Sequence, residues 1–295
     1  MQNNIASIKP MPANRPQRLR RRLFGWLMIG LTGISLALTV SALIAILGYV
    51  LLNGLPALSL DFFTHIPTPT GVPGGGIANA IVGSLIVVGL ATILSVPVGL
   101  GAGIYLSEFG HNRFGSLIRY LADVMSGIPS IVIGIFGYAL IVIRMGHFSA
   151  LAGGISLAVM MLPSIARTTE EMLKLVPQNL REGALALGAP RWRAILEVVM
   201  PAAGPGVLTG IVLAIARVAG ETAPLLFTAF GNLNFNLDLN QPIAALPHTL
   251  YFYAISPYDD WRRLAWGAAV VLALLILITS AVARVIAQPR VGGNR

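Results

Sequence analysis

The chain has 295 residues, of which 56% are apolar and only 11% are charged. Soluble domains carry about 25% charged residues, so this composition indicates a protein built for lipid rather than water. The net charge of +9 does not indicate nucleic-acid binding, because the basic residues lie between long apolar runs and not beside stacking aromatics. The absence of cysteine excludes disulfides, thiolate catalysis and cysteine-ligated metals.

The N-terminal quarter of the chain contains a tail, a span and a loop. Residues 1–22 are polar and basic, and we expect a disordered tail there. The uncharged run 23–52 follows, and its 30 residues far exceed the apolar part of a signal peptide, which is about 7–15 residues long. It therefore predicts a retained membrane-spanning helix. Residues 53–76 contain four prolines and a glycine triplet, which is typical of a loop.

Five more apolar segments are long enough to span a membrane, which takes at least about 18 residues. They cover residues 77–106, 124–143, 148–166, 198–237 and 264–283. The sequence Gly127-Ile128-Pro129-Ser130 should open the second of these helices locally, either to line a pore or as a packed kink. Residues 167–197 form a charged, water-facing loop, and residues 238–263 form a mixed polar loop. The pattern predicts an all-α membrane protein with six transmembrane helices.

The positions of Lys and Arg predict the orientation of these helices, because cytoplasmic loops carry an excess of positive charge. With the N-terminus in the cytoplasm, 16 Lys and Arg residues lie inside and three lie outside, while Arg217 lies within the membrane. The same orientation places the C-terminus and the 167–197 loop in the cytoplasm. Removing the weakest span, 148–166, would invert this distribution, so the charges also support that span.

Arg217 and Glu221 are the only charged residues in the span 198–237. We expect them on one helical face, four residues apart, with Arg217 roughly 16 Å into the membrane when counted from Gly206 at about 1.5 Å per residue. An intramembrane charge costs about 2.5–3.5 kcal/mol, so the pair should face the bundle interior. It is either an ion pair that only fixes packing, or an anion site in which Glu221 holds the Arg217 guanidinium and prevents it from trapping the anion.

The cytoplasmic loop contains a spaced motif. It reads Arg181-Glu182-Gly183-Ala184-Leu185-Ala186-Leu187-Gly188, then nine residues, then Val198-Val199-Met200-Pro201. The small residues at 183, 184 and 188 permit close approach of a partner, and Pro201 should end the loop before the next span. Glu182 can cap a helix or pair with a base across an interface. The simpler alternative is an ordinary surface helix with Gly188 as its C-cap.

This motif resembles the cytoplasmic signature of ABC importer permeases, in which the segment forms a short helix that docks on the ATP-hydrolysing subunit. The stretch Arg-x-x-Gly-Glu-Thr-Ala-Pro-Leu-Leu-Phe, residues 217–227, is similar to the permease subunits of phosphate-specific ABC importers. Segments 127–132, 162–171, 246–247 and 255–266 fit the same family, and the similarity covers nearly the whole chain after Leu23.

The resemblance implies a type I ABC importer permease fold, with a tail (1–22), a permease domain (23–287) that contains the coupling loop (167–201), and a second cytoplasmic tail (288–295). It implies import of inorganic phosphate across a bacterial inner membrane, with the chain forming half of the pore. The implied substrate-path residues are Arg217, Glu221 and Thr222, and the implied ATPase-coupling residues are Glu182, Gly183, Ala184, Gly188 and Pro201.

The implied partners are a homologous second permease, two ATPase subunits, a periplasmic phosphate-binding protein and membrane lipid. We expect no enzymatic activity, no metal and no cofactor in this chain, and ATP is used by the ATPase. The chain has no G-x-x-x-x-G-K-[ST] motif for ATP phosphates, and its four histidines lack metal-ligand spacing.

Two alternatives remain open. The first is a permease for another oxyanion, such as sulfate or molybdate. The second is an ion-coupled secondary carrier in which Glu221 would titrate, although such a carrier does not need the docking motif.

Overall fold

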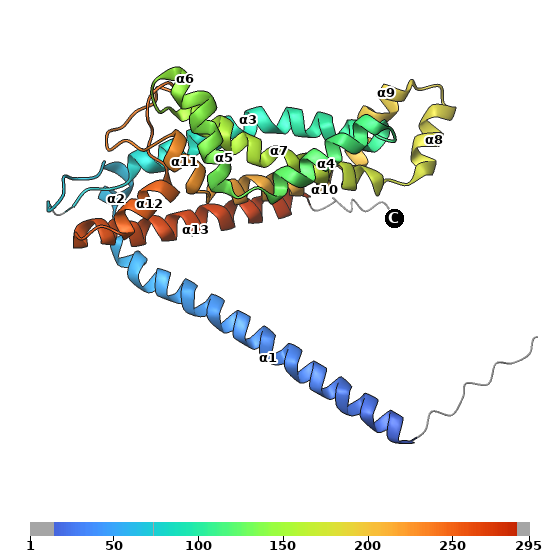
Figure 1. Ribbon diagram of the computed structural model, residues 1–295, viewed down its shortest axis with the longest axis horizontal. Helices are drawn as coiled ribbons and strands as arrows, with labels where there is room; N and C mark the ends of the chain where they lie inside the picture. Colours follow the sequence, from blue (N-terminus) through green and yellow to red (C-terminus); the bar gives the residue numbers. More distant parts are fainter. Residues whose placement is uncertain (1–14, 73, 288–295) are drawn as a thin grey trace, which may run out of the picture. The chain divides into compact units, whose positions relative to one another are not determined.

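The computed structural model of the protein describes residues 15–72 and 74–287 (Figure 1). The chain divides into two compact units, residues 1–51 and 52–295. The described residues are mostly helical, with one isolated β-bridge between Phe230 and Ile243. Most of the predicted 1–22 tail and all of the predicted 288–295 tail lie outside the described residues.

Helix α1 (Arg15–Gly54) makes up, as far as Leu51, the described part of the first unit. It begins eight residues before the predicted span, so residues 15–22 are helical and the expectation of disorder is wrong for them. Arg, Leu and Gln are good helix formers, and a helix already nucleated by the long apolar run extends readily into such residues. The apolar side chains along α1, from Leu23 to Leu52, are largely exposed, which suits surroundings of lipid tails.

The described chain has five helical stretches long and apolar enough to cross a membrane, and a sixth crossing if one bent pair counts as a span. The five are α1, α3 (Ala78–Glu108), α7 (Ala150–Lys174), the stretch Arg191–Ala219 and α13 (Asp259–Ala287). The bent pair consists of α4 (Arg113–Gly127) and the stretch Ser130–Met145, which meet at 102°. The latter comprises α5 (Ser130–Gly137), a π-helical turn (Tyr138–Val142) and α6 (Ile143–Met145).

The break between α4 and α5 falls at Ile128 and Pro129. This confirms the predicted local opening at residues 127–130. Proline has no N–H and forces the residue before it out of the helical region, so the Ile128-Pro129 pair ends α4 there. Ile128 indeed has an extended backbone, with ψ of 129°.

Helices extend further into the polar segments than the sequence predicted. All three predicted loops contain short helices. The 53–76 loop holds a 3₁₀ turn (Leu55–Ala57) and α2 (Leu60–Thr64), and the 238–263 loop holds α12 (Leu246–Ala254). In the charged loop, residues 167–174 are the last turns of α7, followed by α8 (Gln178–Ala186) and α9 (Arg191–Ala194). The end of α7 carries ion pairs one helical turn apart, such as Arg167–Glu171 at 3.4 Å, which support a helix outside the apolar run.

Helices α3 and α7 form the centre of the second unit, and glycines allow their close packing. A Cβ on Gly99 would lie 2.8 Å from Ile165 Cβ, and one on Gly103 would collide with Thr169. From the other side, a Cβ on Gly154 would lie 2.8 Å from Leu90 Cβ. Small residues at such contacts are typical of membrane helices, where association rests on close van der Waals packing. We call these contacts the α3–α7 seam.

The two ends of the second unit differ. Helices α8 and α9 lie at one end, and α2 and α12 lie at the other (Figure 1). At the α12 end, the first turn of α7 donates otherwise unpaired N–H groups to the segment after α11 (Ala223–Thr228). Ala150 N–H bonds the Gln241 carbonyl and Leu151 N–H bonds the Leu239 carbonyl, both at 3.0 Å. This segment is therefore fixed to the scaffold.

Candidate functional site

The first candidate region is a second helix break, between α10 (Met200–Ala219) and α11. Gly220 N–H bonds the Arg217 carbonyl at 3.3 Å, and Glu221 N–H bonds the Val218 carbonyl at 3.0 Å, which closes the last turn of α10 tightly. Pro224 then stands in the first turn of α11. Arg217 and Glu221 are therefore not on one continuous helix as predicted, because the helix ends at Ala219 between them.

The predicted contact between these two charges is also not formed. Among the described residues, neither Arg217 nor Glu221 has an ion-pair partner within 4.0 Å. Glu221 and Thr222 are half-buried in the break, and Arg217 is exposed. The substrate-path role of these three residues stays a prediction.

Arg217 lies on a face of α10 that points away from the core of the unit. Leu213, one turn earlier, is 56% exposed, whereas Ala214, Ala216 and Val218 are buried. A guanidinium that remains charged cannot be left against lipid tails without a large cost. This face therefore requires a polar cavity or a protein partner.

The two helix breaks belong to packed neighbours. Helix α5, which begins after the first break, packs on α11, which begins after the second. A Cβ on Gly134 of α5 would lie 2.8 Å from Pro224 Cα and 3.1 Å from the Ala223 carbonyl oxygen. Paired discontinuous helices often line substrate sites in transporters, because their breaks free backbone groups inside the membrane. Gly134 and Gly137 of α5 indicate in the sequence that another helix packs closely there, but the sequence does not identify that helix.

The second candidate region is the predicted docking motif, which folds as α8. Glu182 and Gly183 are exposed, and Ala184 is half-buried. A Cβ added at Gly183 would meet no atom within 4 Å. Within the described residues, the Glu182 side chain has no hydrogen-bond or ion-pair partner. The outer face of α8 is thus open to a second protein.

Gly188 has a local structural reason to be glycine. Its φ is +83°, in the left-handed region that glycine occupies without strain. Its N–H bonds the Leu185 carbonyl at 3.0 Å, and Ala189 N–H bonds the Ala184 carbonyl at 3.2 Å, which together close the end of α8. The geometry is that of the helix C-cap given as the alternative interpretation. A role in ATPase coupling stays a prediction.

Pro201 does not end the loop, and this expectation is corrected. The chain is helical from Arg191 onwards, through α9, a π-helical turn (Ile195–Val199) and α10. Pro201 stands in the first turn of α10. The wider π turn immediately before the proline accommodates a residue that cannot donate a hydrogen bond, so the helix continues through it.

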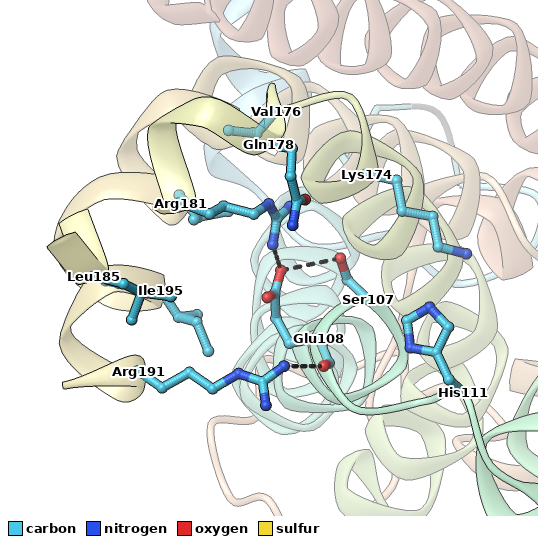
Figure 2. Close-up of a pocket in the computed structure, with 12 residues that line it drawn as sticks. Ser107, Glu108, His111, Lys174, Val176, Gln178, Arg181, Leu185, Arg191 and Ile195 are labelled. Carbon is cyan, nitrogen blue, oxygen red and sulfur yellow. Dashed lines mark hydrogen bonds and ion pairs between the residues drawn. The ribbon is translucent and has the colours of Figure 1, made fainter. Parts of the chain in front are cut away.

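Beside α8 lies a polar cavity of about 400 Å³, between the ends of α3, α7, α8 and α9. Glu108, the last residue of α3, forms an ion pair with Arg181 of α8 in this cavity (Figure 2). Arg181 also donates to the Leu173 carbonyl at 2.6 Å, and Arg191 donates to the Glu108 carbonyl at 3.1 Å. Sequence reasoning missed Glu108, because it belongs to no motif and lies 73 residues from Arg181.

A second charged cluster joins α4 to the end of α7. Arg119 Nε donates to Glu170 at 2.7 Å and Lys174 Nζ lies 2.5 Å from the same carboxylate, while Arg167 pairs with Asp123. Arg119 also donates to the carbonyls of Leu106 and Gly110, both at 2.8 Å. These contacts fix α4 to the scaffold. In the part of the chain that the structure describes, no group of three or more His, Cys, Asp or Glu side chains could hold a metal ion.

The motif on α8 and both helix breaks fall within the range matched by one protein family. Residues 95–291 match the family described as the inner membrane component of binding-protein-dependent transport systems. The chain belongs to this family. The matched residues include both helix breaks, α8, Arg217 and Glu108.

Curated relatives in this family cover nearly the whole chain. The phosphate transport system permease protein PstA of Haemophilus influenzae is 44% identical over 269 residues, which are 91% of this chain and 95% of the relative. The PstA of Yersinia pestis is 43% identical over 94% of each chain. PstA 1 of Mycobacterium tuberculosis strain H37Rv is 36% identical over 91% of this chain and 89% of the relative. The resemblance to phosphate importer permeases is thereby confirmed.

Solved structures support the fold. A chain of a bacterial alginate ABC transporter has a TM-score of 0.65 at 12% identity, covering 94% of this chain and 98% of that chain. A chain of the MetNI methionine ABC transporter in an inward-facing conformation has a TM-score of 0.61 at 18% identity, covering 72% and 94%. The predicted type I ABC importer permease fold is confirmed.

Proposed function

We propose that this chain is the permease subunit of an ABC importer for inorganic phosphate and forms one half of its translocation pore. The observation that carries the proposal is Arg217, which stands exposed at the end of α10 in a chain 44% identical to a phosphate permease. The exposed α10 face becomes pore lining once a homologous second permease covers it. Multi-pass insertion in the bacterial inner membrane follows from the family and the long apolar helices.

Arg217 acts as the cation of the phosphate path. Guanidinium presents several N–H donors in a fixed plane and forms bidentate pairs with phosphate oxygens. Because Arg217 is not engaged by a carboxylate in the described residues, these donors are available to a passing anion. In the adjacent break, Glu221 limits by repulsion how long the anion stays, and the Thr222 hydroxyl group offers the anion a hydrogen-bond donor.

Helix α8 couples transport to ATP hydrolysis in a partner ATPase, of which the complex holds two copies. Glu182, Gly183, Ala184 and Gly188 form the docking segment, and Pro201 stands where the helix after it enters the membrane. The 16-to-3 distribution of Lys and Arg supports a cytoplasmic α8 and cytoplasmic termini. A periplasmic phosphate-binding protein then delivers phosphate at the α12 end. This chain itself binds no cofactor.

The proposal is tested by reconstituting the complete complex in proteoliposomes. Phosphate together with its binding protein should stimulate ATP hydrolysis and drive uptake of labelled phosphate, whereas sulfate and molybdate should neither stimulate nor compete. Stimulation by sulfate or molybdate instead would transfer the assignment to another oxyanion. Phosphate uptake without the ATPase, driven by a proton gradient, would support the secondary carrier.

A further inference from the structure

The last residue of α3, Glu108, contacts both α8 and α9. The Glu108 carboxylate pairs with Arg181 on α8, while the Glu108 carbonyl accepts a hydrogen bond from Arg191 Nη2 at 3.1 Å on α9 (Figure 2). The Arg191 guanidinium carbon lies 4.8 Å from the ring centroid of Phe109, the next residue. We call these contacts of Glu108 with Arg181 and Arg191 the α3 clamp.

The ion pair of the clamp is shielded from water. The Glu108 side chain is 8% exposed and the Arg181 side chain 15%, whereas the nearby Arg193–Glu197 pair is 56% and 59% exposed. Ser107 Oγ donates to the Glu108 carboxylate at 3.3 Å, which gives that charge a second partner. Exposed pairs contribute little, but removal of one member of a shielded pair leaves the other charge without compensation. Glu108 and Arg181 therefore constrain each other's positions.

Beyond the clamp, helix α8 packs against the π turn Ile195–Val199 and α9. None of its residues is buried, so no apolar core fixes its orientation. It is bounded by Pro177 and by the left-handed Gly188, two places where the chain direction changes. Arg181 is the α8 residue that contacts two scaffold helices, with Glu108 at the end of α3 and the Leu173 carbonyl in the last turns of α7.

We propose that Glu108 is a positioning residue that transmits the movement of α8 to α3. The functional part of this inference rests on the proposed role of α8 in ATPase docking. When the ATPase displaces α8, the clamp moves the end of α3 with it, and the α3–α7 seam carries that movement along the membrane helices. Without the clamp, α8 remains docked but turns about Pro177 and Gly188, so ATP hydrolysis continues without productive movement of the pore.

The first experiment measures coupling in the reconstituted complex, as ATP hydrolysed per phosphate imported. Glu108→Gln should raise this ratio about tenfold, with normal assembly and retained ATP hydrolysis, and Arg181→Gln should do the same. Glu197→Gln is the matched control, because it removes the same charge from an exposed pair at the same end. A wild-type ratio in both clamp variants would overturn the proposal.

A covalent link separates positioning from a specific need for the carboxylate. The chain has no cysteine, so Glu108→Cys with Arg181→Cys can be joined selectively by a short bifunctional thiol reagent. The unlinked double variant should be uncoupled, and linking should return the ratio to within about twofold of the wild type. A linked protein that hydrolyses ATP but stays as uncoupled as the unlinked one would refute positioning.

The second measurement does not depend on phosphate transport. Spin labels at Gly101→Cys on α3 and Asn179→Cys on α8, both exposed positions, report the distance between the two helices by pulsed electron resonance in the whole complex. The distribution should be narrow in the otherwise native protein and broad with Glu108→Gln. Equal widths would overturn the clamp. If Glu108→Gln broadens the distance distribution but the native complex does not transport phosphate, the clamp is supported and the proposed function is refuted.

Discussion

The charges at the α8 end and the charges at the α10–α11 break are treated differently by the fold. At the α8 end, Arg119, Lys174 and Arg181 each pair with a carboxylate of the same chain. At the break, Arg217 and Glu221 stand four residues apart and, among the described residues, pair with nothing. The charges that join α4, α7, α8 and the end of α3 are thus paired within the subunit, whereas those at the break are left to a substrate or a second subunit.

The difference implies opposite responses to mutation. A charge that already has a partner is part of the structure, so its loss changes the positions of helices. An exposed charge without a partner can be removed without disturbing the fold, so its loss affects only what the charge was going to bind.

The largest expected effect comes from Arg217→Gln. Phosphate uptake should fall to background, because no cation remains in the path, while assembly with the ATPase stays normal, because the exposed side chain makes no ion pair within the described chain. Uptake of labelled phosphate and co-purification of the complex measure the two quantities.

Arg217→Lys is the control, since it keeps the charge but loses the planar donors, and partial uptake is expected. The double variant Arg217→Gln, Glu221→Gln should stay inactive. Near-normal uptake by a well-assembled double variant would contradict the transport role and restore the packing interpretation.

The second largest effect is expected in the α3–α7 seam, which belongs to the scaffold that supports both regions. Gly103→Val should destabilise the subunit by about 1–3 kcal/mol, because the new side chain collides with Thr169 and the Ala166 carbonyl in the α3–α7 seam. Thermal unfolding of the purified subunit should show a lower midpoint. Gly101→Val on the same helix is the matched control, since a Cβ there meets no atom within 4 Å. Equal midpoints for the two variants would argue against a tight seam.

A third prediction concerns His248, a group that the fold keeps neutral at the α12 end. Burial lowers its pKa to about 4, although a hydrogen bond to the Phe230 backbone acts in the opposite direction. The unfolded chain, with an ordinary pKa near 6.5, binds more protons between about pH 6.5 and 4, so stability should fall as the pH drops through that window.

The loss attributable to His248 should be about 1–2 kcal/mol between pH 7 and pH 5. Thermal unfolding of the wild type and of His248→Gln across this range measures it as a difference, because the variant retains the other titrating groups. Parallel pH profiles for the two proteins would show that the buried imidazole does not carry the effect.

The smallest effect is expected at the end of α8. Gly188→Ala should weaken binding of the permease to its ATPase by roughly 1 kcal/mol, because alanine is strained at the φ of +83° that closes the docking helix. Gly183→Ala, within α8 and with open space around it, should be neutral or slightly stabilising by contrast. Both are measured by the affinity of the permease for its ATPase. The larger Gly188→Trp should reduce co-purification of the ATPase further, and undiminished co-purification and transport would contradict the docking assignment.

Much of this architecture could be predicted from local patterns. The length and hydropathy of the apolar runs predicted the membrane spans. The motif at 181–201 predicted α8, and the Ile128-Pro129 pair predicted the first helix break. These features depend on neighbouring residues alone. The helical residues 15–22 and α12 were missed because helices nucleated by apolar or packed residues extend into polar sequence that by itself suggests a loop or tail.

The site was harder to predict, because its contacts join distant residues. A contact between Arg217 and Glu221 one turn apart requires a continuous helix, whereas α10 ends at Ala219 and α11 begins at Ala223. Pro201 was expected to end the loop before the next span, but the chain is already helical from Arg191, nine residues before α10 begins. Glu108 follows the apolar run 77–106 and belongs to no motif, and its partner on α8 can be identified only in three dimensions.

The α3–α7 seam has a consequence for how the protein is made. Helix α3 is synthesised before α7, and the 41 residues from 109 to 149 separate the two helices. At about 5–20 residues per second, synthesis of these residues takes roughly 2–8 s. During that interval its glycine-lined face has no partner in this chain, and the bent segment α4–α5 enters the bilayer beside it. Biogenesis of this subunit should therefore depend on an insertase or chaperone that holds α3 in the membrane until α7 arrives.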